Sequence, residues 1–228
     1  MALELQDLLF LHWPVEPEAL IRRIPPPLQL EIWDQRGWLG VVAFRVAGIR
    51  WVGCPLRIPG LSFPQVNVRT YVTRNGRPGV WFFSLDVANR PAVWGARLGF
   101  HLPCFQSRMS FRKTPQGIYV NARRTHRKAP GASFRAWYRP GAEKPPPNGE
   151  SRDHWLLERY RLFAANPKGR LFSCEIQHAP WSVHQVEAVV ETNTLAEPLG
   201  LSIPETEPML HYSPGLELIA GWPVKIRV

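Results

Sequence analysis

The sequence predicts a mainly β protein whose short strands form either a barrel or a two-sheet sandwich. Twenty-four prolines among 228 residues argue against long helices, because each proline removes a backbone donor and fixes φ. Residues 63–72 alternate between polar and apolar side chains, which is the period of a strand. Further short apolar segments are separated by turn residues, as is typical of all-β folds.

The first elements follow from proline positions and apolar periodicity. Residues 8–13 are expected to form a strand that Pro14 ends, and residues 17–24 a short helix with proline in its first turn. After a triple proline, residues 28–33 and 38–45 are expected to form two strands joined by a turn.

The next element is a hairpin of residues 63–72 and 79–86, in which Asn75-Gly76 supplies the turn because both residues tolerate positive φ. One face of its first strand carries polar side chains: Gln65, Asn67, Arg69 and Tyr71. The second strand is too apolar for an open surface. The polar row is therefore expected to face either water or a cavity.

The remaining elements are short. Residues 92–99 should form a helix, because Asn89 can cap it and Pro91 fits its first turn. The other expectations are strands at 109–111, 118–124, 133–138, 159–164, 170–178 and 183–191, a loop at 140–149, helical turns at 151–158 and 192–199, and strands at 209–212 and 216–219 around a turn at 213–215.

Composition favours one domain, residues 1–228, in the cytoplasm. The N-terminus shows no signal-peptide pattern, and no apolar run approaches the length of a membrane span. Three widely spaced cysteines, Cys54, Cys104 and Cys174, do not suggest a disulfide framework. No membrane partner is expected, and the oligomeric state, including a homo-oligomer, is left open.

The formal net charge of +10 raises the alternative of nucleic-acid binding. The densest basic segment of the chain runs from Arg112 to Arg139. A solvated strand face explains this segment equally well. No nucleotide-binding or paired metal-ligand motif is present, so no cofactor and no metal are expected. Cys174 and His178 share a strand face, but their spacing is not that of zinc sites.

Several motifs in order resemble the YqjF-like bacterial family of uncharacterised proteins. They include residues 63–71, residues 79–86, His101-Leu-Pro103, Glu158-Arg-Tyr160, His178-Ala-Pro-Trp181 and Leu210-His-Tyr-Ser-Pro-Gly215. That family is similar in fold to acetoacetate decarboxylase. The resemblance implies a closed antiparallel β-barrel around a ligand cavity, with two or three short helices at its rim.

The resemblance also allows a test of the decarboxylase chemistry. Acetoacetate decarboxylase uses a Schiff-base lysine whose pKa a second lysine lowers. At the corresponding stretch this chain has Cys104 and Phe105, and the nearest lysine is Lys113. Decarboxylation through a Schiff base is therefore not expected.

The candidate ligand-binding residues follow from the polar strand face. Arg69 would bind an anionic group, with Gln65, Asn67 and Tyr71 as polar contacts. A solvated sheet face with cross-strand pairs is the alternative for the same four residues.

Other candidates lie elsewhere in the chain. Arg97 and His101 share a helix face with Arg90 and are expected to project into the barrel mouth, Arg97 as a ligand contact and His101 as an acid–base group, with a solvent-facing stripe or an ion pair as the alternative. Glu158, beside Tyr160, is either a general base or a structural ion-pair partner of Arg69 or Arg97. His178, Trp181 and His211 either line the pocket or hold loops in place. The sequence thus predicts binding, with or without transformation, of a small organic acid or carbonyl compound; a non-catalytic binding or interaction module is the alternative.

Overall fold

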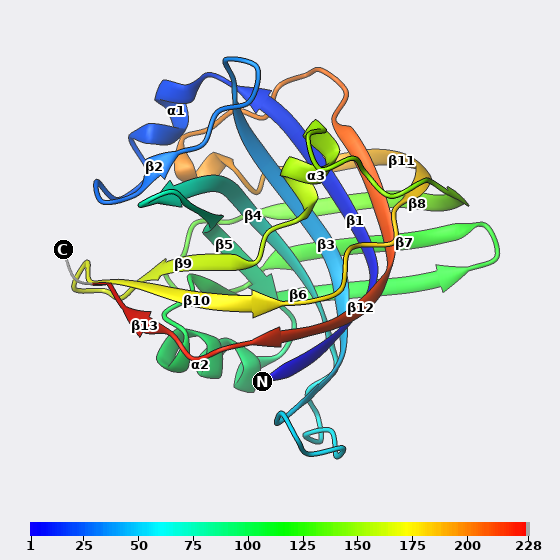
Figure 1. Ribbon diagram of the computed structural model, residues 1–228. Coiled ribbons are helices and arrows are strands. Elements are labelled where there is room, and N and C mark those ends of the chain that lie inside the picture. The colour runs from blue at the N-terminus through cyan, green and yellow to red at the C-terminus, as the bar shows by residue number, and fades with distance from the viewer. Residues whose placement is uncertain (227–228) are drawn as a thin grey trace.

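The computed structural model describes residues 1–226 and consists mainly of β-structure (Figure 1). The strands are β1 (Ala2–Val15), β2 (Gln29–Leu30), β3 (Gly37–Arg50), β4 (Phe63–Arg74), β5 (Arg77–Val87), β6 (Cys104–Thr114), β7 (Gly117–Arg124), β8 (Ser133–Glu143), β9 (Arg161–Ala165), β10 (Leu171–Gln177), β11 (His184–Asn193), β12 (Met209–Ala220) and β13 (Val224–Lys225). The helices are α1 (Pro17–Ile21), α2 (Arg90–Gly99), α3 (Arg152–Leu157) and the 3₁₀ turn η1 (Glu197–Leu199).

All of these strands belong to one sheet. Its hydrogen-bonded order is β13, β10, β9, β5, β6, β7, β8, β11, β12, β1, β3, β4, β2, and β4 also pairs with β5. The expectation of a purely antiparallel sheet is wrong, because β5 runs parallel to both β6 and β9. The reason is the connection: α2 crosses from the end of β5 to the start of β6, and a crossover of this kind joins parallel strands.

The hairpin of β4 and β5 forms as its turn residues predict. Asn75 and Gly76 have φ values of 50° and 70°, and Arg74 lies opposite Arg77 across the two-residue turn. On the apolar face of β4, Val66, Val68 and Val72 belong to the largest buried cluster. The polar face of the strand therefore points to the other side of the sheet.

The expected turn at residues 213–215 is wrong, because β12 runs without interruption through this segment. Gly215 has a φ of 125°, and a Cβ atom at this position would lie 1.9 Å from the backbone oxygen of Leu5. The Ser-Pro-Gly sequence thus lets β12 approach β1 closely beside Asp7, whose own φ is 52° and at which the β1–β3 register shifts. Pairing with a neighbouring strand overrode the local turn signal.

The helices largely follow their capping residues. The Asn89 side chain accepts a hydrogen bond of 2.9 Å from the backbone N–H of Ala92, which fixes the start of α2. Gly200, at φ 65°, ends η1 as a left-handed cap. Two expectations were too long: residues 28–33 contribute only β2, and the expected loop at 140–149 begins after β8 ends at Glu143.

Three segments that are far apart in the sequence meet at one end of the molecule. Figure 1 shows α2, the chain start at β1 and the connection between β3 and β4 together at this end, whereas α1 and α3 lie toward the other. No helix within residues 1–226 has the length and apolar character that would let it cross a membrane.

Candidate functional site

A cavity with a volume of about 520 Å³ and a mainly apolar wall lies within the described part of the chain. Strands β1, β3, β4 and β5 contribute to this wall from the sheet, and α2 covers it from one side. Fully buried side chains such as Leu8 and Phe10 form part of the wall, whereas Trp51, Leu98 and Trp222 in the same wall are 50%, 77% and 65% exposed. The cavity therefore opens to the surface beside these three side chains.

The polar row of β4 reaches this cavity. Gln65, Asn67 and Arg69 lie in the wall, whereas Tyr71, one step further along the same face, is fully buried beyond it. The guanidinium carbon of Arg69 lies 5.6 Å from the ring centre of Phe10 and 5.9 Å from that of Tyr71. The alternative of a solvated sheet face therefore does not apply, because this row faces the interior.

Arg69 has no ion-pair partner within residues 1–226. Its Nε and Nη2 atoms are buried without a hydrogen-bond partner in that part of the chain, and so is the Oδ1 atom of Asn67. A buried polar atom without a partner costs free energy, which a ligand or water can recover by bonding to it. Cationic and amide groups in this position are suited to binding an anionic oxygen.

A second buried arginine, Arg159, lies in the same wall between α3 and β9. Its Nη1 atom donates to Glu31 Oε2 at 2.5 Å, and its guanidinium carbon lies 4.9 Å and 4.6 Å from the ring centres of Tyr71 and Trp155. Burial raises the pKa of Glu31, and the neighbouring Arg159 opposes that shift. The Arg159 charge is thus balanced by Glu31, whereas the Arg69 charge is not.

The wall has a net positive character. Three arginines contribute to it, Arg69, Arg159 and Arg161, and no Asp, Glu or Lys side chain within the described residues does so. Arg161 pairs with the largely exposed Glu175. Since only two of the three guanidinium groups have carboxylate partners, the cavity favours an anion over a cation.

Two histidines lie close to the arginine end of the cavity. His12 is fully buried on β1, and its ring centre lies 6.1 Å from that of Tyr71 and 5.8 Å from that of His211. Burial, then the charges of Arg69 and His211, lower the pKa of His12 well below its usual value, so its imidazole is neutral. His211, itself buried, has its Nε2 atom 3.2 Å from Asp153 Oδ2.

Among residues 1–226, this wall contains no lysine that could act as a Schiff-base nucleophile. Cys104 stands in the wall where the resemblance placed a lysine, and burial raises the pKa of its thiol to about 12. A thiol with so high a pKa is a poor nucleophile at neutral pH. Lys113 instead bonds to Asp7 Oδ1 at 2.8 Å, outside the wall.

The remaining sequence candidates fall into two groups. His178 and Trp181 lie in the cavity wall. Glu158 and Tyr160 do not: Glu158 Oε2 accepts from the Tyr160 hydroxyl at 2.5 Å, and Oε1 accepts from the backbone N–H of Trp181 at 2.9 Å. The prediction that Glu158 forms an ion pair with Arg69 or Arg97 is therefore wrong. Glu158 instead bonds to the segment that carries Trp181.

His101, Arg97 and His211 lie outside the wall as well. The His101 ring lies 4.1 Å from the Phe172 ring, and Arg97 is exposed and donates to the backbone oxygen of Cys104 at 2.9 Å. The acid–base roles of His101 and Glu158 stay predictions, and their positions outside the wall lend them no support.

Sequence reasoning missed Arg159 and His12. The sequence predicts a strand that starts at residue 159, but β9 begins only at Arg161, so Arg159 lies in the segment between α3 and β9 and contributes to the cavity wall. His12 had a readable signal, because it is the one polar residue among the expected strand residues 8–13. A histidine in a strand that is otherwise apolar is a candidate interior group.

The fold and the cavity define a mainly β protein of acetoacetate decarboxylase-like fold. Over 99% of this chain and 87% of the other, it is similar to the acetoacetate decarboxylase of Legionella pneumophila, with a TM-score of 0.65 and 11% identity. It is also similar to the enduracididine biosynthesis enzyme MppR complexed with pyruvate, with a TM-score of 0.60 and 13% identity over 98% of this chain and 89% of that one.

The chain belongs to the DUF2071 family of uncharacterised conserved proteins, whose model matches residues 2–217. It is 38% identical over 221 residues to the uncharacterised protein YqjF of Bacillus subtilis (strain 168), which covers 96% of this chain and 89% of the relative. The family expected from the motifs in the sequence is therefore confirmed.

Proposed function

We propose that this protein binds a small organic acid or carbonyl compound inside its cavity, with Arg69 as the anion clamp. The observation that carries the proposal is a guanidinium without a carboxylate partner in a wall that contains no acidic side chain within residues 1–226. A charge-assisted, bidentate bond to a carboxylate would satisfy nitrogens that otherwise have no partner. Asn67 and Gln65 would orient the bound group.

The enclosure of the ligand is part of the same proposal. Successive pairings run from β5 through β9, β10, β12, β1, β3 and β4 and return to β5, and every one of these strands contributes to the cavity wall. We take this series as a closed barrel whose interior holds the ligand. A carboxylate held away from bulk water interacts more strongly with a guanidinium, because the local dielectric constant is lower.

A pyruvate complex of a protein with a similar fold supports a carboxylate as the ligand. The chemistry of the present wall differs from a Schiff-base site, since it holds Cys104 and no lysine within the described residues. If a reaction follows binding, we favour His12 and Tyr71 for proton transfer, because both lie beside Arg69, although neither is part of the cavity wall. Non-catalytic ligand binding by the same cavity is the alternative.

The nucleic-acid alternative draws little support from the basic segment between Arg112 and Arg139. Arg124 is buried and bonded to Asp86, and Arg135 and Arg139 pair with Glu191 and Glu187. A surface that binds phosphates needs free cationic groups. These pairs leave fewer of them than the sequence suggests.

A melting-shift screen tests the proposal. Wild-type protein is heated with small carboxylates and with the matched uncharged amides, and the same is done with Arg69→Gln and with Arg123→Gln as a charge-matched control on an exposed side chain. Loss of the Arg69 contact should weaken acid binding by about 2 kcal/mol, or about thirtyfold. Stabilisation that is equal for acids and amides, or unchanged in Arg69→Gln, would refute the anion clamp.

A further inference from the structure

The cavity is polar at one end and apolar along most of its length. The β-ladder registers fix which side chains lie at the same depth, because partners across a ladder are level with one another. Asn67 lies opposite Val42, and Val42 opposite Phe10. Arg69, two residues further along the same face of β4, lies deeper in the cavity. Beyond Arg69, the guanidinium of Arg159 stacks on Tyr71.

Toward α2, the successive levels become apolar. Phe63 lies opposite Val46, and Val46 opposite Leu5. Ile49 lies opposite Leu3, and Leu3 opposite Leu218. The Arg69 guanidinium lies against Phe10, at the level of Asn67, and from Asn67 to Phe63 the strand advances four residues, or about 13 Å. An apolar passage of this order therefore separates the arginine end from the outer levels.

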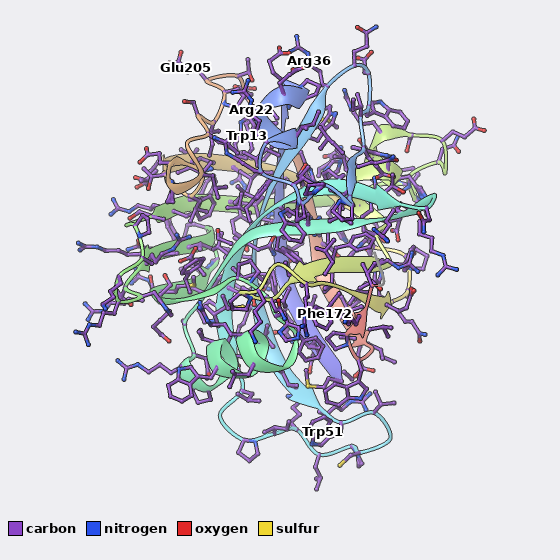
Figure 2. All side chains as sticks on the ribbon, turned by 90° about the vertical axis from the view of Figure 1, so that its left-hand side faces the viewer. Trp13, Arg22, Arg36, Trp51, Phe172 and Glu205 are labelled. Carbon is purple, nitrogen blue, oxygen red and sulfur yellow. The ribbon has the colours of Figure 1, made fainter. Side chains whose placement is uncertain are left out.

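The outer end carries apolar side chains that the fold leaves exposed. The Trp222 ring centre lies 6.3 Å from that of Trp51 and 6.1 Å from that of Phe100, and α2 adds Leu98 and Ala96 to the same wall. Figure 2 shows Trp51 on the connection between β3 and β4, at the end of the molecule where α2 lies. Exposed aromatic groups around a cavity mouth are suited to contact an apolar ligand that enters there.

We propose that the ligand of this cavity is an amphipathic carboxylic acid, whose carboxylate bonds to Arg69 and whose extended apolar chain lies along the wall toward α2 and Trp222. This inference rests on the anion clamp proposed above and adds the chemical class of the rest of the ligand. A short polar acid would occupy only the arginine end and leave the apolar levels without contacts, which forfeits both burial and dispersion energy.

Calorimetric titration of the wild-type protein with butanoate, hexanoate, octanoate and decanoate, below their micelle concentrations, tests the chain dependence. Each added methylene should tighten binding about fourfold, equivalent to about 0.8 kcal/mol, until the chain reaches the mouth. Equal affinity for butanoate and decanoate would overturn the inference. In that case a loss of affinity in Arg69→Gln for both acids would still uphold the anion clamp.

A comparison of octanol with octanoate tests the anion clamp separately from the apolar chain. If octanol bound as tightly as octanoate, and Arg69→Gln changed neither, the anion clamp would fail and with it the acid head group assigned here. The expected result is that octanoate binds about thirtyfold more tightly than octanol in wild-type protein, and that Arg69→Gln abolishes this difference.

A substitution at the outer end of the cavity tests where the apolar chain of the ligand lies. Ala96→Phe adds bulk to the cavity wall from α2, and Arg90→Phe adds a phenyl ring to an exposed position of the same helix outside the wall. Ala96→Phe should weaken the binding of decanoate at least tenfold and leave the affinity for butanoate unchanged. Arg90→Phe should change neither affinity. An equal effect of Ala96→Phe on both acids would contradict the placement of the chain.

Discussion

Arg159 stacks on Tyr71, with its guanidinium carbon 4.9 Å from the centre of the phenol ring, while its Nη1 atom bonds to Glu31. Burial raises the pKa of Tyr71, an effect that the charges of Arg69 and Arg159 oppose. Two cations therefore share one aromatic ring, and only one of them has a carboxylate partner. This arrangement supplies the excess positive charge on which the proposed anion site depends.

Removing the carboxylate of that pair should have two opposite effects. Glu31→Gln leaves Arg159, whose side chain is 5% exposed, without its counter-charge, so the free energy of unfolding should fall by about 3 kcal/mol. Affinity for an anionic ligand should rise, because the wall gains positive character. Chemical unfolding and calorimetric titration measure the two quantities; Glu175→Gln, at the exposed partner of Arg161, should cost less than about 1 kcal/mol. A variant that bound the acid more weakly would contradict the electrostatic argument.

A second buried ion pair joins β5 to β7. Asp86 and Arg124 are 1% and 3% exposed and form two hydrogen bonds, of 2.9 Å and 2.7 Å. Asp86→Asn leaves the Arg124 charge buried and unpaired, so we expect a loss of about 3 to 5 kcal/mol in the free energy of unfolding. Glu187→Gln, which breaks the exposed pair with Arg139, is the control and should cost less than about 1 kcal/mol. Similar losses in the two variants would show that burial does not decide the cost.

His12 should make stability depend on pH. Because its pKa is lower in the folded protein than in the unfolded chain, the unfolded chain binds the proton more readily. Its stabilising contribution is then complete above about pH 6.5 and is lost as the pH falls below that value, by up to about 1.4 kcal/mol per pH unit. Urea unfolding at a series of pH values measures the slope.

The matching variant is His12→Gln, which removes the titrating group but keeps a polar side chain beside Arg69 and His211. Its stability should decline less steeply below about pH 6.5 than that of the wild type. His126, whose pKa burial also lowers, contributes with the same sign and remains in both proteins. An identical slope in the two would show that His12 is not held neutral by the fold.

Gly215 should tolerate no side chain. Gly215→Ala would place a methyl group against the Leu5 carbonyl at a φ of 125°, and we expect a loss of at least about 2 kcal/mol. Gly95→Ala, in α2 with no atom within 4 Å of the added Cβ, should instead be stabilising by up to about 1 kcal/mol. Thermal unfolding compares the two, and a neutral Gly215→Ala would mean that β12 does not approach β1 this closely.

The sequence predicted the β4–β5 hairpin and the polar row on one face of β4, because strand periodicity and the Asn75-Gly76 turn are local signals, but it left open whether that row faces water or a cavity. It could not predict that β12 continues through Ser213-Pro-Gly215, since that depends on the facing backbone of β1. Arg159 was missed for a similar reason. Its direction is set by the irregular segment between α3 and β9, and its partner Glu31 lies 128 residues away in the chain.

The crystal structure of the protein grown with decanoate tests the central claim most directly. The account predicts electron density for the carboxylate within hydrogen-bond distance of the Arg69 guanidinium, with the chain extending past Phe63 toward α2. A carboxylate located instead at Trp51 and Trp222, with the chain directed toward Arg69, would contradict it.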